Sequence, residues 1–147
     1  MVRPRLKEHT VKVNDAQIHY YTYGAGPPLL FIHGHRSDTR RWENIILYLG
    51  KFFKVYSPDL PGFGKSPALA GWHTMARYGQ YLIAFCKKLY LSEVVLVGGS
   101  MGGIIALHML KSPDISIQKL LLLETPYDRA YFRIGKKTRR LVRLALK

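Results

Sequence analysis

A serine lies in the run GGSMG at residues 98–102, which matches the pattern G-x-S-x-G. Apolar residues typical of a strand precede this run, and apolar residues with helical spacing follow it. A sharp strand-to-helix turn lifts the serine hydroxyl clear of the sheet and brings the residues on either side of it into contact, so that only very small side chains fit there. We therefore expect Ser100 to be a nucleophile that attacks a carbonyl carbon, with a glycine-rich turn and an incidental serine as the alternative.

Acyl transfer also needs two N–H groups aimed at the oxygen on which negative charge develops. The helix that follows Ser100 offers the backbone N–H of Met101. A second donor is the backbone N–H of His35, in the run FIHGHR that ends the first buried strand. The side chains of His33 and His35 are expected to be ordinary loop histidines. They have no carboxylate or thiolate at zinc-like spacing, so we expect no metal site.

The elements that must position these residues alternate between strand and helix along the chain. A nearly continuous apolar run at 28–32 predicts a strand that is buried on both faces, and further strands are predicted at 52–57, 93–97 and 118–123. Helical spacing predicts the helices, at 42–49, 74–89 and 102–110. Two alternating runs, 9–14 and 17–23, predict an antiparallel hairpin. The fold class is therefore α/β, a doubly wound and mostly parallel sheet with an N-terminal antiparallel hairpin.

Three motifs, FIHGHRSDTRRW, SPDLPGFGKS and VGGSMGG, resemble in order and spacing those of the α/β-hydrolase superfamily. The likeness spans residues 20–125 and is greatest to the esterase, carbon–carbon hydrolase and epoxide-hydrolase-like group. It implies that Ser100 is the nucleophile and that the N–H groups of His35 and Met101 form an oxyanion hole. A serine at this turn favours cleavage of an ester, thioester, amide or carbon–carbon bond. It disfavours the epoxide and haloalkane chemistry of relatives that use aspartate there.

The chain departs from the superfamily pattern at some positions. Gly99 stands where relatives often carry a histidine or another larger residue, which predicts a looser turn. The pattern also requires an acid and then a histidine after the nucleophile. Glu124 ends the last expected strand and is the candidate acid, with a strand-end polar residue as the alternative. The pattern makes Asp59 a loop-structuring residue.

No histidine in the sequence takes the catalytic place that the pattern requires. His108 is the one histidine after Ser100, and it lies about two turns into the following helix, where it cannot reach the hydroxyl. His73 is a loop residue without a counterpart in the pattern. We therefore expect the catalytic histidine beyond Lys147. The chain alone is then expected to be inactive, although the protein is expected to be an enzyme.

The chain has 147 residues, a length that suits one domain. The resemblance divides it into the N-terminal part of a hydrolase core, 1–128, and a basic amphipathic segment, 129–147, that begins a lid. It implies that the C-terminal strands and the rest of the lid are missing from the sequence. The function predicted is an esterase-like serine hydrolase, seen as an incomplete chain. The alternative is a non-catalytic, truncated hydrolase-fold binding protein without the catalytic histidine.

Composition narrows the class of protein further. An apolar content of 48% excludes disorder of the whole chain, and a single cysteine, Cys86, excludes a disulfide scaffold. The N-terminus has no apolar run, so we expect no secretory signal and a cytoplasmic location. Residues 94–110 carry no formal charge, but their glycine pairs favour a strand, turn and helix over a membrane span.

The net charge of +14 is concentrated near the C-terminus, where residues 129–147 hold eight basic residues and no acidic one. Such a run indicates the solvated face of a helix or a weak contact with a membrane surface. Nucleic acid is not favoured as a partner because few aromatic residues interleave with the charges. The expected partner is a small-molecule substrate. No nucleotide-binding pattern is complete, so no cofactor is expected.

Overall fold

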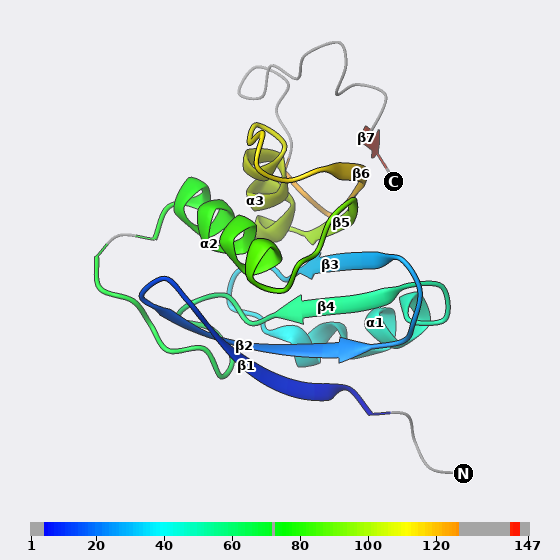
Figure 1. Ribbon diagram of the computed structural model, residues 1–147, viewed down its shortest axis with the longest axis horizontal. Coiled ribbons are helices and arrows are strands. Elements are labelled where there is room, and N and C mark those ends of the chain that lie inside the picture. The colour runs from blue at the N-terminus through cyan, green and yellow to red at the C-terminus, as the bar shows by residue number, and fades with distance from the viewer. Residues whose placement is uncertain (1–4, 72, 127–141, 145–147) are drawn as a thin grey trace.

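A seven-stranded sheet forms the centre of the computed structural model, which describes residues 5–71, 73–126 and 142–144 (Figure 1). The strands lie in the order β1-β2-β4-β3-β5-β6-β7. Their bounds are β1 Lys7–Val13, β2 Ala16–Tyr23, β3 Pro28–Ile32, β4 Lys54–Pro58, β5 Val94–Gly99, β6 Ile117–Leu123 and β7 Val142–Leu144. The pairs β1–β2 and β2–β4 are antiparallel, and the remaining pairs are parallel. The predicted hairpin and the mostly parallel sheet are confirmed.

Helices cover both faces of the sheet, as Figure 1 shows. A short 3-10 turn, η1 (Thr39–Trp42), leads into α1 (Glu43–Leu49) on one face. The longer helices α2 (Met75–Lys88) and α3 (Met101–Met109) cover the other face. This arrangement accounts for the apolar runs in the sequence, because strands between two helical layers have no wet face.

Alternate residues of the central strands contribute to two separate apolar clusters. In β3, Leu30 and Ile32 join the larger cluster with α2 and α3, whereas Leu29 and Phe31 join the smaller cluster with α1. Because side chains alternate across a strand, each central strand supplies both layers. The start of α2 has a local cause. Thr74 Oγ1 accepts a hydrogen bond of 3.1 Å from Arg77 N–H and caps the helix, which begins where the sequence predicts it.

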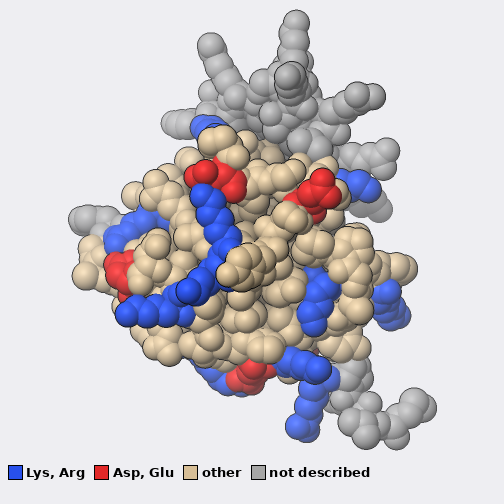
Figure 2. All heavy atoms as spheres, in the orientation of Figure 1, with Lys and Arg blue, Asp and Glu red and all other residues tan. Residues whose placement is uncertain are grey.

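The basic segment 129–147 lies outside the described residues except for Val142–Leu144. These three residues form β7, which runs parallel to β6 with Leu120 opposite Val142. Elsewhere, Lys and Arg side chains are interspersed with acidic ones over the face shown in Figure 2. Within the described residues, no helix has both the length and the apolar character needed to cross a bilayer. Residues 94–110 form β5, a turn and α3, as the glycine pairs predict.

The first turn of α3 lies directly against the end of β3. A Cβ atom at Gly102 would overlap the carbonyl oxygen of Ile32 and would lie 2.6 Å from that of His33. A Cβ atom at Gly98 would lie 2.5 Å from the Cα of Gly103. All these neighbouring atoms belong to the main chain, so they cannot move away by a change of rotamer. Glycines on both sides of Ser100 therefore allow α3 to start where it does.

We predict opposite effects on stability for two glycine-to-alanine substitutions in buried helices. Gly102→Ala should lower the free energy of unfolding by about 1–3 kcal/mol or more, since the backbone of β3 must shift. Gly79→Ala, in α2, should raise it by up to ~1 kcal/mol, because its Cβ would lie 3.5 Å from Met109 Cγ, an ordinary contact. Urea unfolding measures both, and equal stability of the two variants would contradict this packing.

Candidate active site

Ser100 connects β5 to α3 in a backbone conformation that side chains rarely adopt. Its φ is 51° and its ψ is −118°. Such a conformation costs on the order of 1–3 kcal/mol and persists only where the surroundings enforce it. Here Ser100 N–H donates to the carbonyl oxygen of Leu123 at 2.8 Å, and Gly103 N–H donates to the carbonyl oxygen of Ser100 at 3.0 Å. The residue is half-buried and follows directly on the carboxyl end of β5.

The loop after β3 lies beside this serine. A Cβ atom at Gly34 would be 3.2 Å from the Ser100 Cβ and 3.8 Å from its Oγ. The next residue, His35, is exposed, and its ring meets Phe63 edge-on at 5.8 Å between centroids. Met101, the other expected N–H donor, is buried and is the first residue of α3. The structure thus brings together the two chain segments that were predicted to form the oxyanion hole.

The side chain of His33 is part of the framework of this loop. It is fully buried, and Nδ1 lies 2.8 Å from the carbonyl oxygen of Gly34. Leu60 N–H donates to Nε2 at 2.9 Å, which places the ring proton on Nδ1. Burial lowers the pKa of His33. A neutral ring with both nitrogens engaged joins the loop after β3 to the loop after β4, and has no proton-transfer role at Ser100.

Asp59 holds the same region from a second side. Its Oδ1 accepts from Thr39 N–H and its Oδ2 accepts from Lys65 N–H, both at 3.0 Å. The carboxylate also occupies the place that a side chain would take at Gly64, whose φ is 54°. Because the carboxylate is 1% exposed, these two bonds replace its hydration. The structure agrees with a loop-structuring role for Asp59.

A polar network that was not predicted from the sequence extends from Asp59 to the hairpin. His19 Nδ1 lies 3.5 Å from Asp59 Oδ2, and its Nε2 lies 3.2 Å from Glu8 Oε2. Lys65 also pairs with Glu8, and this contact is the main cause that lowers the pKa of Glu8. The four side chains come from β1, β2 and the loop after β4. No periodicity in the sequence relates them, so there was no local signal to find.

Glu124, the candidate acid, follows β6 at the same edge of the sheet as Ser100. Its neighbour Leu123 accepts the hydrogen bond from Ser100 N–H, so the two residues leave adjacent strands. Glu124 is exposed and has a φ of 47°. Within the described residues its carboxylate has no hydrogen-bond or ion-pair partner. The position is compatible with an acid that orients a histidine, but the structure does not bring a histidine to it in the described part.

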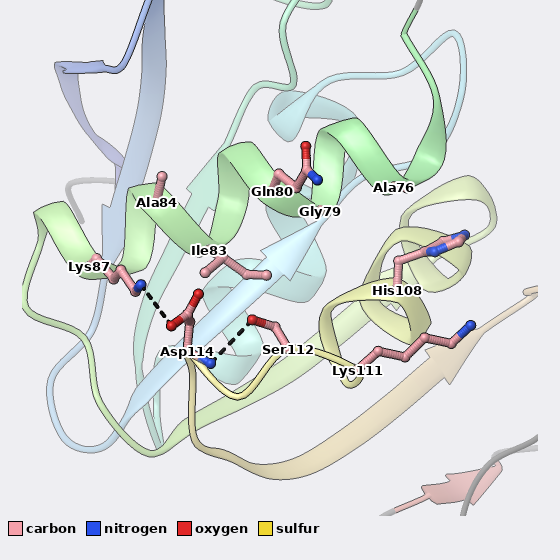
Figure 3. A pocket seen from close by; sticks show the side chains of 10 residues that line it. All are labelled: Ala76, Gly79, Gln80, Ile83, Ala84, Lys87, His108, Lys111, Ser112 and Asp114. Carbon is pink, nitrogen blue, oxygen red and sulfur yellow. Dashed lines mark hydrogen bonds and ion pairs between the residues drawn. The ribbon is translucent and has the colours of Figure 1, made fainter.

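His108 and His73, the two histidines weighed against the pattern as bases, make other contacts in the structure. His108 is eight residues beyond Ser100, a rise of about 12 Å along α3. It borders a groove of about 430 Å³ between α2 and the C-terminal end of α3, across which Lys87 pairs with Asp114 at 3.1 Å (Figure 3). His73 Nε2 lies 2.9 Å from the carbonyl oxygen of Leu69. At that rise along the helix, His108 cannot reach the hydroxyl of Ser100.

The fold and the serine turn define the class of protein. The chain belongs to the α/β-hydrolase family, whose model, described as the alpha/beta hydrolase fold, matches residues 27–140. One relative is the (E)-2-((N-methylformamido)methylene)succinate hydrolase of Acinetobacter baylyi, 33% identical over 80% of the chain and 45% of the relative. Another is the pimeloyl-(acyl-carrier protein) methyl ester esterase of Vibrio vulnificus, 32% identical over 65% of the chain and 35% of the relative.

A solved structure with the same fold is that of the epoxide hydrolase CorEH, with a TM-score of 0.77 and 26% identity. That match covers 82% of the chain and 43% of CorEH. The chain thus spans less than half the length of these relatives. The family model and these relatives confirm the resemblance seen in the three motifs.

We predict that His33 makes stability depend on pH. Its pKa is lower in the folded than in the unfolded protein, so the unfolded chain takes up the proton first as pH falls. The free energy of unfolding should therefore stay constant above about pH 6.5 and decrease below it. His33 accounts for a decrease of at most ~1.4 kcal/mol per pH unit.

Urea unfolding of the wild type and His33→Gln between pH 7.5 and pH 5 measures this contribution. The glutamine variant should be less stable at neutral pH and should lose less stability as pH falls. His35→Gln, a change at an exposed loop histidine, is the matched control and should keep the wild-type pH dependence. Identical pH dependence in the wild type and His33→Gln would contradict the buried, neutral state of His33.

Proposed function

We propose that the chain carries the nucleophile and the oxyanion hole of a serine hydrolase that cleaves an ester-like or related carbonyl substrate. The observation that supports this most directly is the turn at Ser100, whose φ is positive, with the loop at Gly34 so near that a Cβ atom added there would lie 3.2 Å from the Ser100 Cβ. A serine forced into this conformation at a helix N-terminus is costly to maintain, and a nucleophile is the use that explains the cost.

The proposed reaction proceeds through an acyl-enzyme. Ser100 Oγ attacks the carbonyl carbon, and the resulting oxyanion accepts hydrogen bonds from the N–H groups of Met101 and His35. The leaving group departs with a proton, and an acyl ester remains on Ser100. Water then hydrolyses this ester and releases the acid. A base must accept the serine proton in the first step. We assign this role to a histidine beyond Lys147, with Glu124 as the acid that orients it.

Serine at residue 100 favours acyl transfer over the reactions that the names of some relatives state. The matched proteins include an epoxide hydrolase and a haloalkane dehalogenase as well as an esterase. The resemblance associates aspartate at the turn with the first two activities, whereas serine is the nucleophile of the ester and carbon–carbon hydrolases. Ser100 therefore supports acyl transfer. Removal of the histidine base alone can cost on the order of 10⁶ in turnover, so the 147-residue chain should react slowly by itself.

Labelling with a fluorophosphonate tests the role of Ser100. In the protein expressed with whatever sequence follows residue 147 in its reading frame, we expect one label, on the peptide that contains Ser100. Ser100→Ala should lose the label, because no other hydroxyl is activated by the turn. Ser112→Ala, a change in the loop after α3, is the matched control and should be labelled as the wild type is. An unlabelled wild type, or equal labelling of Ser100→Ala, would contradict the proposal.

A further inference from the structure

Trp42 fills the space beside the serine turn that a side chain at residue 99 would otherwise take. A Cβ atom at Gly99 would lie 2.6 Å from Cη2 and 2.7 Å from Cζ2 of the indole ring. Contacts this short do not occur in folded proteins, so a larger residue at 99 and the ring in its present place exclude each other. The ring thus occupies the space that a larger residue at 99 would need.

The same ring touches the other two parts of the candidate site. Its Nε1–H donates to Ser37 Oγ at 3.1 Å, and Ser37 belongs to the loop that carries His35. Its centroid lies 5.2 Å from that of Phe31, in β3 just before this loop. One rigid side chain thus contacts β3, the loop after β3 and the residue before Ser100.

We propose that Trp42 is a positioning residue of the active site, which fixes the His35 loop relative to Ser100 in place of a side chain at residue 99. The catalytic part of this proposal rests on the proposed function. Glycine at 99 gives the turn more conformational freedom than any other residue would. The indole restricts that freedom by contact, and its bond to Ser37 holds the loop two residues from the expected N–H donor. Oxyanion stabilisation requires such donors to be held in place before the reaction.

A double-mutant cycle tests whether Trp42 and Gly99 are a matched pair. Gly99→Ala should lower the urea midpoint of the wild type, since the ring must move. In a Trp42→Ala background the same change should leave the midpoint unchanged or raise it, because the new methyl group enters vacated space. Equal effects of Gly99→Ala in both backgrounds would overturn the pairing.

Hydrogen exchange tests the positioning role without any need for activity. Trp42→Phe keeps a ring but removes the donor to Ser37, and it guards against failure of Trp42→Ala to fold. Both variants should exchange the amides of residues 34–38 and 98–102 at least tenfold faster relative to the rest of the sheet. Ile46→Ala removes a buried side chain of the same apolar cluster and is the control, expected to speed exchange evenly. An even increase in the Trp42 variants would overturn the proposal.

The labelling rate separates this proposal from the proposed function. In the protein that reacts with fluorophosphonate, Trp42→Phe should slow labelling of Ser100 about tenfold at a temperature where both proteins are fully folded. Wild-type labelling rates in Trp42→Phe would overturn a role of Trp42 in the reaction. If the wild type itself is unlabelled, the proposed function fails, while the exchange pattern still decides whether Trp42 positions the loop.

Discussion

The candidate site depends on how closely the backbone of α3 approaches the carboxyl end of β3. The absence of a side chain at Gly102 lets α3 begin against the carbonyl groups of Ile32 and His33. With α3 fixed there, the chain must turn sharply at Ser100, and the left-handed φ of 51° is the result. The same approach brings the loop after β3 to the serine. A close contact between main-chain atoms thus determines both the turn at Ser100 and the position of the expected oxyanion donors.

Buried polar groups then hold the loop that follows β3. His33 and Asp59 engage four main-chain groups between them, from that loop, from η1 and from the loop after β4. A buried donor or acceptor left without its partner costs about 1–3 kcal/mol, so these bonds are costly to break one at a time. Trp42 adds a hydrogen bond from its Nε1–H to Ser37 Oγ in that loop, while its ring packs at Gly99. The loop that carries His35 is therefore fixed by three unlike contacts, which favours one geometry over its alternatives.

The strands and helices could be predicted from the sequence because their signals are local. The apolar run at 28–32 and the cap at Thr74 fix β3 and the start of α2 without reference to distant residues. The turn at Ser100 was also predictable, since the G-x-S-x-G pattern lies within five residues, although the contact that requires Gly102 comes from the distant Ile32 and His33. The bond of His33 to Leu60 and the contact of Trp42 with Gly99 join residues far apart in the sequence. A single sequence holds no signal for such pairs, so neither contact could be predicted.

The central claim is that an acyl group is carried by Ser100 during turnover. Rapid mixing of the protein, extended by the sequence that follows residue 147, with excess p-nitrophenyl butyrate and an acid quench would trap that intermediate for peptide mass spectrometry. The account predicts a butyryl group on the peptide that contains Ser100, formed at the rate of an initial burst of p-nitrophenolate. Ester turnover without a butyryl group on that peptide, or with one on another residue, would contradict it.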